Sequence, residues 1–217
     1  MSMRDWRLVQ RRGLPLAALG LMLLLTLWLA LAPAEASLGQ VVKLIYVHGA
    51  LVWTGLLTFS LAGLLGLVAL FLRYILPGAR QRAATWYRGS RAAGLGALIV
   101  WIVYSLSAML VTGLTWGQWI AWNEPRVRAT AMILLAAAAA AVVVRLVGQR
   151  DFTALVNVAL GIVPWVAVSR VEAIRHPVNP IGGSGSTSIQ GFYLLIVLTV
   201  AGLAATLVAW LWLRAEE

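Results

Sequence analysis

The sequence predicts an all-α integral membrane protein built as a bundle of six transmembrane helices. Of its 217 residues, 62% are hydrophobic and only 11% are charged, and the mean hydropathy is +0.90. Soluble domains lie far from these values. The apolar residues are gathered into six runs, each long enough to cross a hydrocarbon core about 30 Å thick as a helix. Because lipid offers no partner to an unpaired backbone group, such runs indicate helices rather than strands.

We expect a single membrane domain over 1–217. Its helices are expected at about 14–33, 46–72, 93–115, 129–147, 152–169 and 190–213. The first run follows a basic stretch, and APAEAS at 32–37 resembles a cleavage site, so a cleaved signal peptide is the alternative. We favour an uncleaved helix because the run is long for a signal sequence. An even number of spans then leaves both termini on one side.

The remaining runs contain residues that suit membrane helices and their ends. Pro125 favours a helix start before the fourth run, and Pro164 is expected to kink the fifth. The sixth run follows a loop rich in glycine and serine at 182–188. Close helix packing is favoured by the alanines at 136–141 and by four glycines, Gly63, Gly66, Gly94 and Gly96.

The basic residues indicate which loops face the cytoplasm. With the N-terminus inside, twelve of the 17 Lys and Arg residues lie on the cytoplasmic side, as the positive-inside rule requires. The five outside are Lys43, Arg126, Arg128, Arg170 and Arg175. Both termini are therefore expected in the cytoplasm, and the outer face receives the three loops 34–45, 116–128 and 170–189. The net charge of +10 then reflects topology and contact with anionic lipid rather than nucleic-acid binding.

The chain has two histidines, and both fall at this outer face. His48 opens the second run in KLIYVHGALVW, and His176 follows the fifth run in SRVEAIRHPVNP. Neutral imidazole is a good ligand for iron and copper, and two histidines on opposing helix ends can hold a planar metal cofactor from both faces. Two ligands make a poor structural zinc site, so the pair favours haem over a bare ion. The alternative is an interfacial histidine hydrogen-bonded to a backbone carbonyl.

Three tryptophans lie between the histidines, in TWGQWIAWNEPRVR. Trp116, Trp119 and Trp122 are spaced three apart and would share one side of a short interfacial helix. Their indoles are suited to cover a porphyrin, although an ordinary belt of interfacial tryptophans is the alternative. Three basic residues are candidates for binding porphyrin propionates through charge-assisted hydrogen bonds: Lys43, Arg126 and Arg128.

Two absences from the sequence limit the reactions that this chain can carry out by itself. The chain has no cysteine, which leaves no thiolate ligand and no CxxCH site for covalent attachment, so any haem is expected to bind non-covalently. It also has no G-x-x-x-x-G-K-[ST] phosphate loop. Any ATP-driven step must therefore belong to another subunit.

The segment WGQWIAWN at 116–123 resembles the tryptophan-rich WGxxWxWD signature, or WWD motif, of the haem-handling proteins of cytochrome c assembly. The pattern of six helices is most similar to the CcmC-type haem exporters within that group. KLIYVH at 43–48 resembles the outer loop that enters the second helix of this family, and 171–176 resembles the segment with its second histidine. The chain departs from the signature at two positions, where Ile120 replaces a tryptophan and Asn123 replaces an aspartate.

This resemblance implies haem b held at the outer face of a bacterial inner membrane for cytochrome c biogenesis. The implied axial ligands are His48 and His176. The implied haem-contacting loop comprises Trp116, Gly117, Trp119, Trp122 and Asn123. The implied partners are subunits of an ABC-type transporter and a periplasmic haem chaperone, in a hetero-oligomeric complex that handles haem without catalysing a reaction.

Two other functions are open alternatives. The second hypothesis is a non-catalytic structural subunit, a six-helix member of a larger membrane complex that binds haem weakly or not at all. The third is a haem-dependent quinol oxidoreductase. Two histidines supply one bis-histidine haem and no transmembrane electron relay, which disfavours the third.

Overall fold

The computed structural model describes residues 3–35, 38–76, 78–172 and 181–214, with side chains from residue 13 onward. The described residues form an all-α structure of six long helices. They are α1 (Met3–Leu31), α2 (Val42–Tyr74), α3 (Arg80–Trp116), α4 (Pro125–Val147), α5 (Arg150–Ser169) and α6 (Thr187–Arg214). Each is long and apolar enough to cross a membrane. The predicted fold class is confirmed to this extent.

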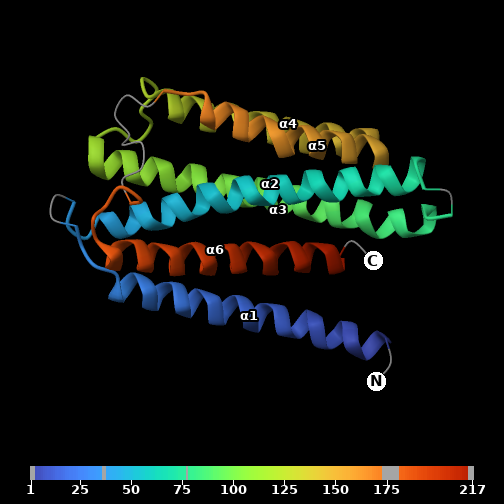
Figure 1. The fold of residues 1–217 in the computed structure, drawn as a ribbon, viewed down its shortest axis with the longest axis horizontal. Coiled ribbons are helices and arrows are strands. Elements are labelled where there is room, and N and C mark those ends of the chain that lie inside the picture. The colour runs from blue at the N-terminus through green and yellow to red at the C-terminus, as the bar shows by residue number, and fades with distance from the viewer. Residues whose placement is uncertain (1–2, 36–37, 77, 173–180, 215–217) are drawn as a thin grey trace.

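The helices run up and down in one bundle (Figure 1). α2 and α3 form its centre, with α5 and α4 on one side and α6 on the other, and α1 packs on the outer side of α6. α1 begins and α6 ends at the same end of the bundle, together with the α2–α3 and α4–α5 turns. The other end gathers the described parts of the three loops that are predicted to face outward. Which end is cytoplasmic stays a prediction.

The predicted start of the third helix, at about 93, is wrong. α3 begins at Arg80 and has 37 residues, or about 56 Å at 1.5 Å per residue, nearly twice a hydrocarbon core. The residues at 80–92 are polar enough to fall outside an apolar run, yet they contain no proline, and helix continues through their single glycine, Gly89. α2 likewise begins four residues before the predicted run, at Val42, whereas α4 begins at Pro125, as that proline predicts.

The predicted close packing at the glycines is confirmed. A Cβ on Gly63 of α2 would lie 2.9 Å from the carbonyl oxygen of Asn157 on α5, and one on Gly66 would lie 2.9 Å from that of Ala154. These helices therefore approach backbone to backbone, as small residues allow in membranes. Beside them, the Trp165 indole donates a hydrogen bond of 2.8 Å to the Ser60 hydroxyl, again joining α5 to α2.

An aromatic cluster joins α2, α3 and α4 in the middle of the bundle. Trp101 is fully buried, with its ring centroid 5.8 Å from that of Phe59 and 4.8 Å from that of Tyr104. Its indole nitrogen donates to the carbonyl oxygen of Thr130, at 3.2 Å. The Tyr104 and Thr130 hydroxyls are also 3.3 Å apart. This cluster fixes the three helices that surround the candidate site.

Candidate functional site

The tryptophan segment is a loop and not the predicted interfacial helix. α3 ends at Trp116, and Gly117 caps it with φ +68°, a left-handed conformation that glycine adopts without strain. The residues at 117–124 contain no helix, and α4 begins at Pro125, where a missing N–H costs nothing. Thr112 holds the loop against α3, because its hydroxyl donates to the Trp119 carbonyl oxygen at 2.9 Å.

The three tryptophans therefore do not share one helical face. Trp116 is half-buried at the end of α3, whereas Trp119 and Trp122 are 59% and 57% exposed. The indole of Trp119 folds back over α3, so closely that a Cβ on Gly113 would lie 2.8 Å from its ring. Loop and helix together place all three indoles around one cavity.

That cavity has a volume of about 280 Å³ and opens between α2, α3, α4 and the tryptophan loop. Its lining is mainly apolar, and few polar side chains reach it. The predicted site residues that line it are His48, Trp116, Trp119, Trp122 and Arg126. The structure thus brings together a histidine, three tryptophans and an arginine that lie up to 78 positions apart in sequence.

His48 lies on α2 at the inner wall of this cavity and is 9% exposed. Its imidazole stacks on the Tyr104 ring of α3, with centroids 4.9 Å apart and an interplanar angle of 28°. Its Nδ1 lies 3.1 Å from the Ser107 hydroxyl oxygen. The ring is therefore held on one face and at one nitrogen by α3.

The hydrogen bonds of Ser107 favour one tautomer of His48. The Ser107 hydroxyl donates its single proton to the Tyr104 carbonyl oxygen, at 2.7 Å. With that proton engaged, the Ser107 oxygen can accept from His48, an arrangement that suits the tautomer protonated at Nδ1. In the neutral ring Nε2 carries the lone pair, and a second-shell bond of this kind orients metal-ligating histidines. The residues present therefore fit a metal-centred group that needs an imidazole Nε2.

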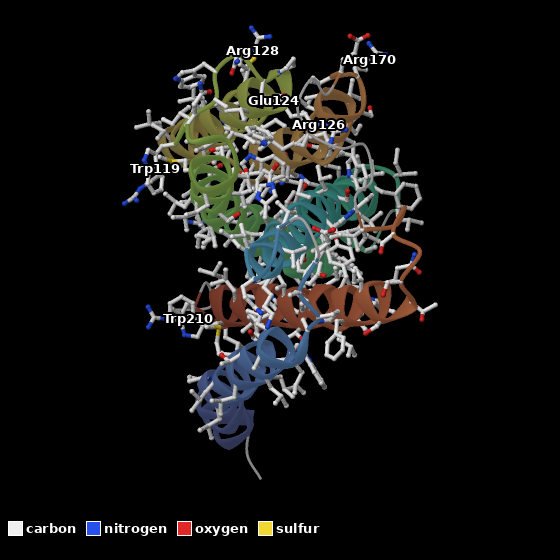
Figure 2. All side chains as sticks on the ribbon, turned by 90° about the vertical axis from the view of Figure 1, so that its left-hand side faces the viewer. Trp119, Glu124, Arg126, Arg128, Arg170 and Trp210 are labelled. Carbon is white, nitrogen blue, oxygen red and sulfur yellow. The ribbon has the colours of Figure 1, made fainter. Side chains whose placement is uncertain are left out.

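Two opposite charges also line the cavity. Glu124 is fully buried at the start of α4, and the partly buried Arg126 follows two residues later. In Figure 2, which looks onto this end of the bundle, Glu124 and Arg126 lie toward its interior, whereas Arg128 and Arg170 lie at the rim. Arg126 is thus the basic candidate that the structure places at the cavity.

The other predicted site residues lie elsewhere. Lys43 donates from Nζ to the Ala30 carbonyl oxygen at 3.2 Å, which ties it to the end of α1. Arg128 is exposed, and neither Gly117 nor Asn123 lines the cavity. His176 falls outside the described residues, so its position relative to His48 stays a prediction.

Sequence reasoning missed Tyr104 and Ser107. Both lie inside an apolar run, 56 and 59 positions after His48, and no local motif links them to it. Only the packing of α2 against α3 brings them together. Among the described residues, no three His, Asp or Glu side chains gather closely enough to hold a metal ion by themselves. The chemistry at this site therefore depends on a single described imidazole and its aromatic surroundings.

No protein-family model matches the chain, and a search of curated proteins finds no match. The cavity and the surroundings of His48 are therefore the features on which a functional proposal depends.

Proposed function

We propose that this protein binds haem b non-covalently at the end of the bundle formed by the tryptophan loop and hands it to a partner during cytochrome c maturation. The observation that carries the proposal is the single cavity wall shared by His48, Trp116, Trp119, Trp122 and Arg126. Residues from three separate parts of the chain converge there. Together they supply the groups that bind a porphyrin, namely an axial imidazole, flat apolar surfaces and a cation.

Each residue then has a distinct role. His48 supplies an axial nitrogen, with His176 as the proposed second ligand, and Ser107 keeps the proton of His48 on Nδ1. The tryptophans cover apolar porphyrin surface, and Arg126 binds a propionate. When bound, haem supplies an iron centre whose axial positions both histidines fill, which leaves no open position for oxygen chemistry.

The cavity volume favours handling over permanent storage. About 280 Å³ is at the lower end of the range for small-molecule sites, roughly 300–1,000 Å³. Such a space encloses part of a porphyrin and leaves an edge accessible to a partner. We propose that a periplasmic haem chaperone takes the haem from this edge. In this proposal, an ABC-type transporter accompanies the chain in a bacterial inner membrane.

A structural subunit without haem is the second candidate, and one observation favours it. His48 is buried, stacked on Tyr104 and bonded to Ser107, which is also how an imidazole with a purely structural role is held. In that case the cavity would receive a lipid chain or a partner's side chain.

Haem loading followed by transfer distinguishes the two. The detergent-purified chain is loaded with haem, passed through a desalting column and mixed with excess apomyoglobin as a generic acceptor. Haem handling predicts retention of about one haem per chain and its release to the acceptor. A chain that retains no haem after the column would contradict the proposal and favour the structural subunit.

A further inference from the structure

A second cavity lies at the opposite end of the bundle from the tryptophan loop. It has a volume of about 350 Å³ and opens where α2 ends and where α3 and α5 begin. Its lining includes three arginines, one from each of these helices, and two tyrosines: Arg73, Arg80, Arg150, Tyr74 and Tyr87. Nothing in the proposed haem site uses these residues.

One carboxylate, that of Asp151, organises this cavity and is fully engaged. It accepts hydrogen bonds from the hydroxyls of Tyr74, at 2.6 Å, and Tyr87, and Nη1 of Arg73 lies 3.1 Å from it. Tyr87 is buried, so this network is built into the junction of α2, α3 and α5. Among the described residues, the cation that pairs with Asp151 is Arg73.

The other two arginines leave an excess of positive charge. Within the described part of the chain, no carboxylate forms an ion pair with Arg80 or Arg150. Arg80 and Arg150 are also the first residues of α3 and α5, and the N-cap residues Ala79 and Gln149 form no side-chain capping bond. Helix starts favour negative charge, so two arginines at two such starts raise the local potential further. The excess positive charge of the lining therefore favours binding of an anion.

The chemistry of the lining selects a phosphate group. Arginine side chains match phosphate oxygens in pairs of parallel hydrogen bonds, and Arg80 and Arg150 at one cavity suit a multiply bonded oxyanion. Exposed apolar side chains flank the lining residues Arg73 and Tyr74 in sequence at the end of α2, namely Phe71, Ile75 and Leu76. A lipid with an anionic headgroup would place its acyl chains along them, and basic pockets between transmembrane helices bind such headgroups.

We propose that this cavity binds a phosphate group, supplied either by the headgroup of an anionic lipid or by free phosphate. Arg80 and Arg150 contact the phosphate oxygens. The network of Asp151, Tyr74, Tyr87 and Arg73 holds the surrounding helix ends in place.

Three probes applied to the purified full-length chain in detergent test this site. They are short-chain phosphatidylglycerol, short-chain phosphatidylcholine and inorganic phosphate, each titrated while native mass spectrometry counts adducts and thermal unfolding is followed. The test variant is Arg80→Gln/Arg150→Gln. The matched control is Arg82→Gln/Arg145→Gln, which removes two exposed arginines that do not line the cavity.

A lipid site predicts saturable binding of phosphatidylglycerol over phosphatidylcholine, weakened about tenfold or more in the test variant and unchanged in the control. If inorganic phosphate stabilises the wild type and not the test variant, while phosphatidylglycerol does not, the site stands with free phosphate as its ligand. The proposal fails if neither anion binds the wild type, or if the test variant binds as the wild type does. The wild-type titration alone can contradict the proposal, so the test remains valid even if the test variant misfolds.

Discussion

The Ser107 hydroxyl oxygen on α3 lies 3.1 Å from Nδ1 of His48 on α2. This contact joins residues 59 positions apart in sequence. Because Ser107 donates to the Tyr104 carbonyl oxygen, its own oxygen can accept a hydrogen bond from Nδ1 of His48. In the proposed function, this contact orients the imidazole for binding through Nε2.

Replacing Ser107 with alanine is expected to weaken haem binding without removing it. His48 loses the acceptor that fixes its tautomer and orientation, and the loss of such a second-shell partner typically costs about 10- to 100-fold in affinity. Haem titration followed at the Soret band measures the change. Ser107→Thr, which keeps a hydroxyl, should restore most of the affinity.

The control for Ser107 is Ser105→Ala. Ser105 lines the same cavity, but its hydroxyl donates to the Trp101 carbonyl oxygen of its own helix and does not reach His48. Equal affinities for wild type and Ser107→Ala would show that the bond does not prepare a ligand.

Arg126→Ala is expected to lower haem retention while leaving the position of the absorption bands nearly unchanged. A propionate contact adds affinity but does not touch the iron. Arg128→Ala and Lys43→Ala serve as controls, since Arg128 is exposed and Lys43 is bonded to Ala30. Retention after repeated desalting is the readout. A larger loss in either control than in Arg126→Ala would move the propionate site away from this cavity.

Gly63→Ala is expected to destabilise the bundle by about 1–3 kcal/mol, because its methyl group would press on the backbone of α5. Gly20→Ala is the control: a Cβ there meets nothing within 4 Å, and alanine is the better helix former. Thermal unfolding in detergent compares the two. If Gly63→Ala is as stable as Gly20→Ala, α2 and α5 do not pack as closely as the structure describes.

The sidedness of the membrane can be tested directly because the chain has no cysteine of its own. Gln118→Cys lies in the tryptophan loop, and Gln81→Cys lies in the first turn of α3; both positions are exposed. A membrane-impermeant maleimide applied to intact cells with an opened outer membrane should label the first and reach the second only after permeabilisation. The reverse pattern would place the tryptophan loop in the cytoplasm and exclude delivery of haem to a periplasmic chaperone.

Hydropathy was enough to predict the six spans. A long apolar run in lipid must form a helix to pair its backbone groups, whatever tertiary contacts it makes. Hydropathy missed the first 13 residues of α3, because helix can continue into water where the sequence is polar. The three-residue spacing of the tryptophans predicted a short helix through Trp119 and Trp122, where instead the left-handed Gly117 ends α3 and Pro125 starts a new helix.

The candidate site was predictable only where residue type itself signals chemistry. His48, the tryptophans and Arg126 carry such signals, and the structure places them around one cavity. Ser107 and Tyr104 carry none, because a serine in an apolar helix usually hydrogen-bonds to a carbonyl of its own helix, and a tyrosine usually packs in the core. Their part in the site depends on the register between α2 and α3, which local sequence does not encode.

The most direct test of haem binding by this histidine pair is the visible absorption spectrum of the purified chain supplied with haem, oxidised and after reduction with dithionite. We predict a low-spin Soret band and a sharp α-band in the wild type and in Tyr104→Phe, which keeps the ring stacked on His48. Both bands should disappear in His48→Ala/His176→Ala. A wild type that stays colourless, or a double variant with the wild-type spectrum, would contradict the account.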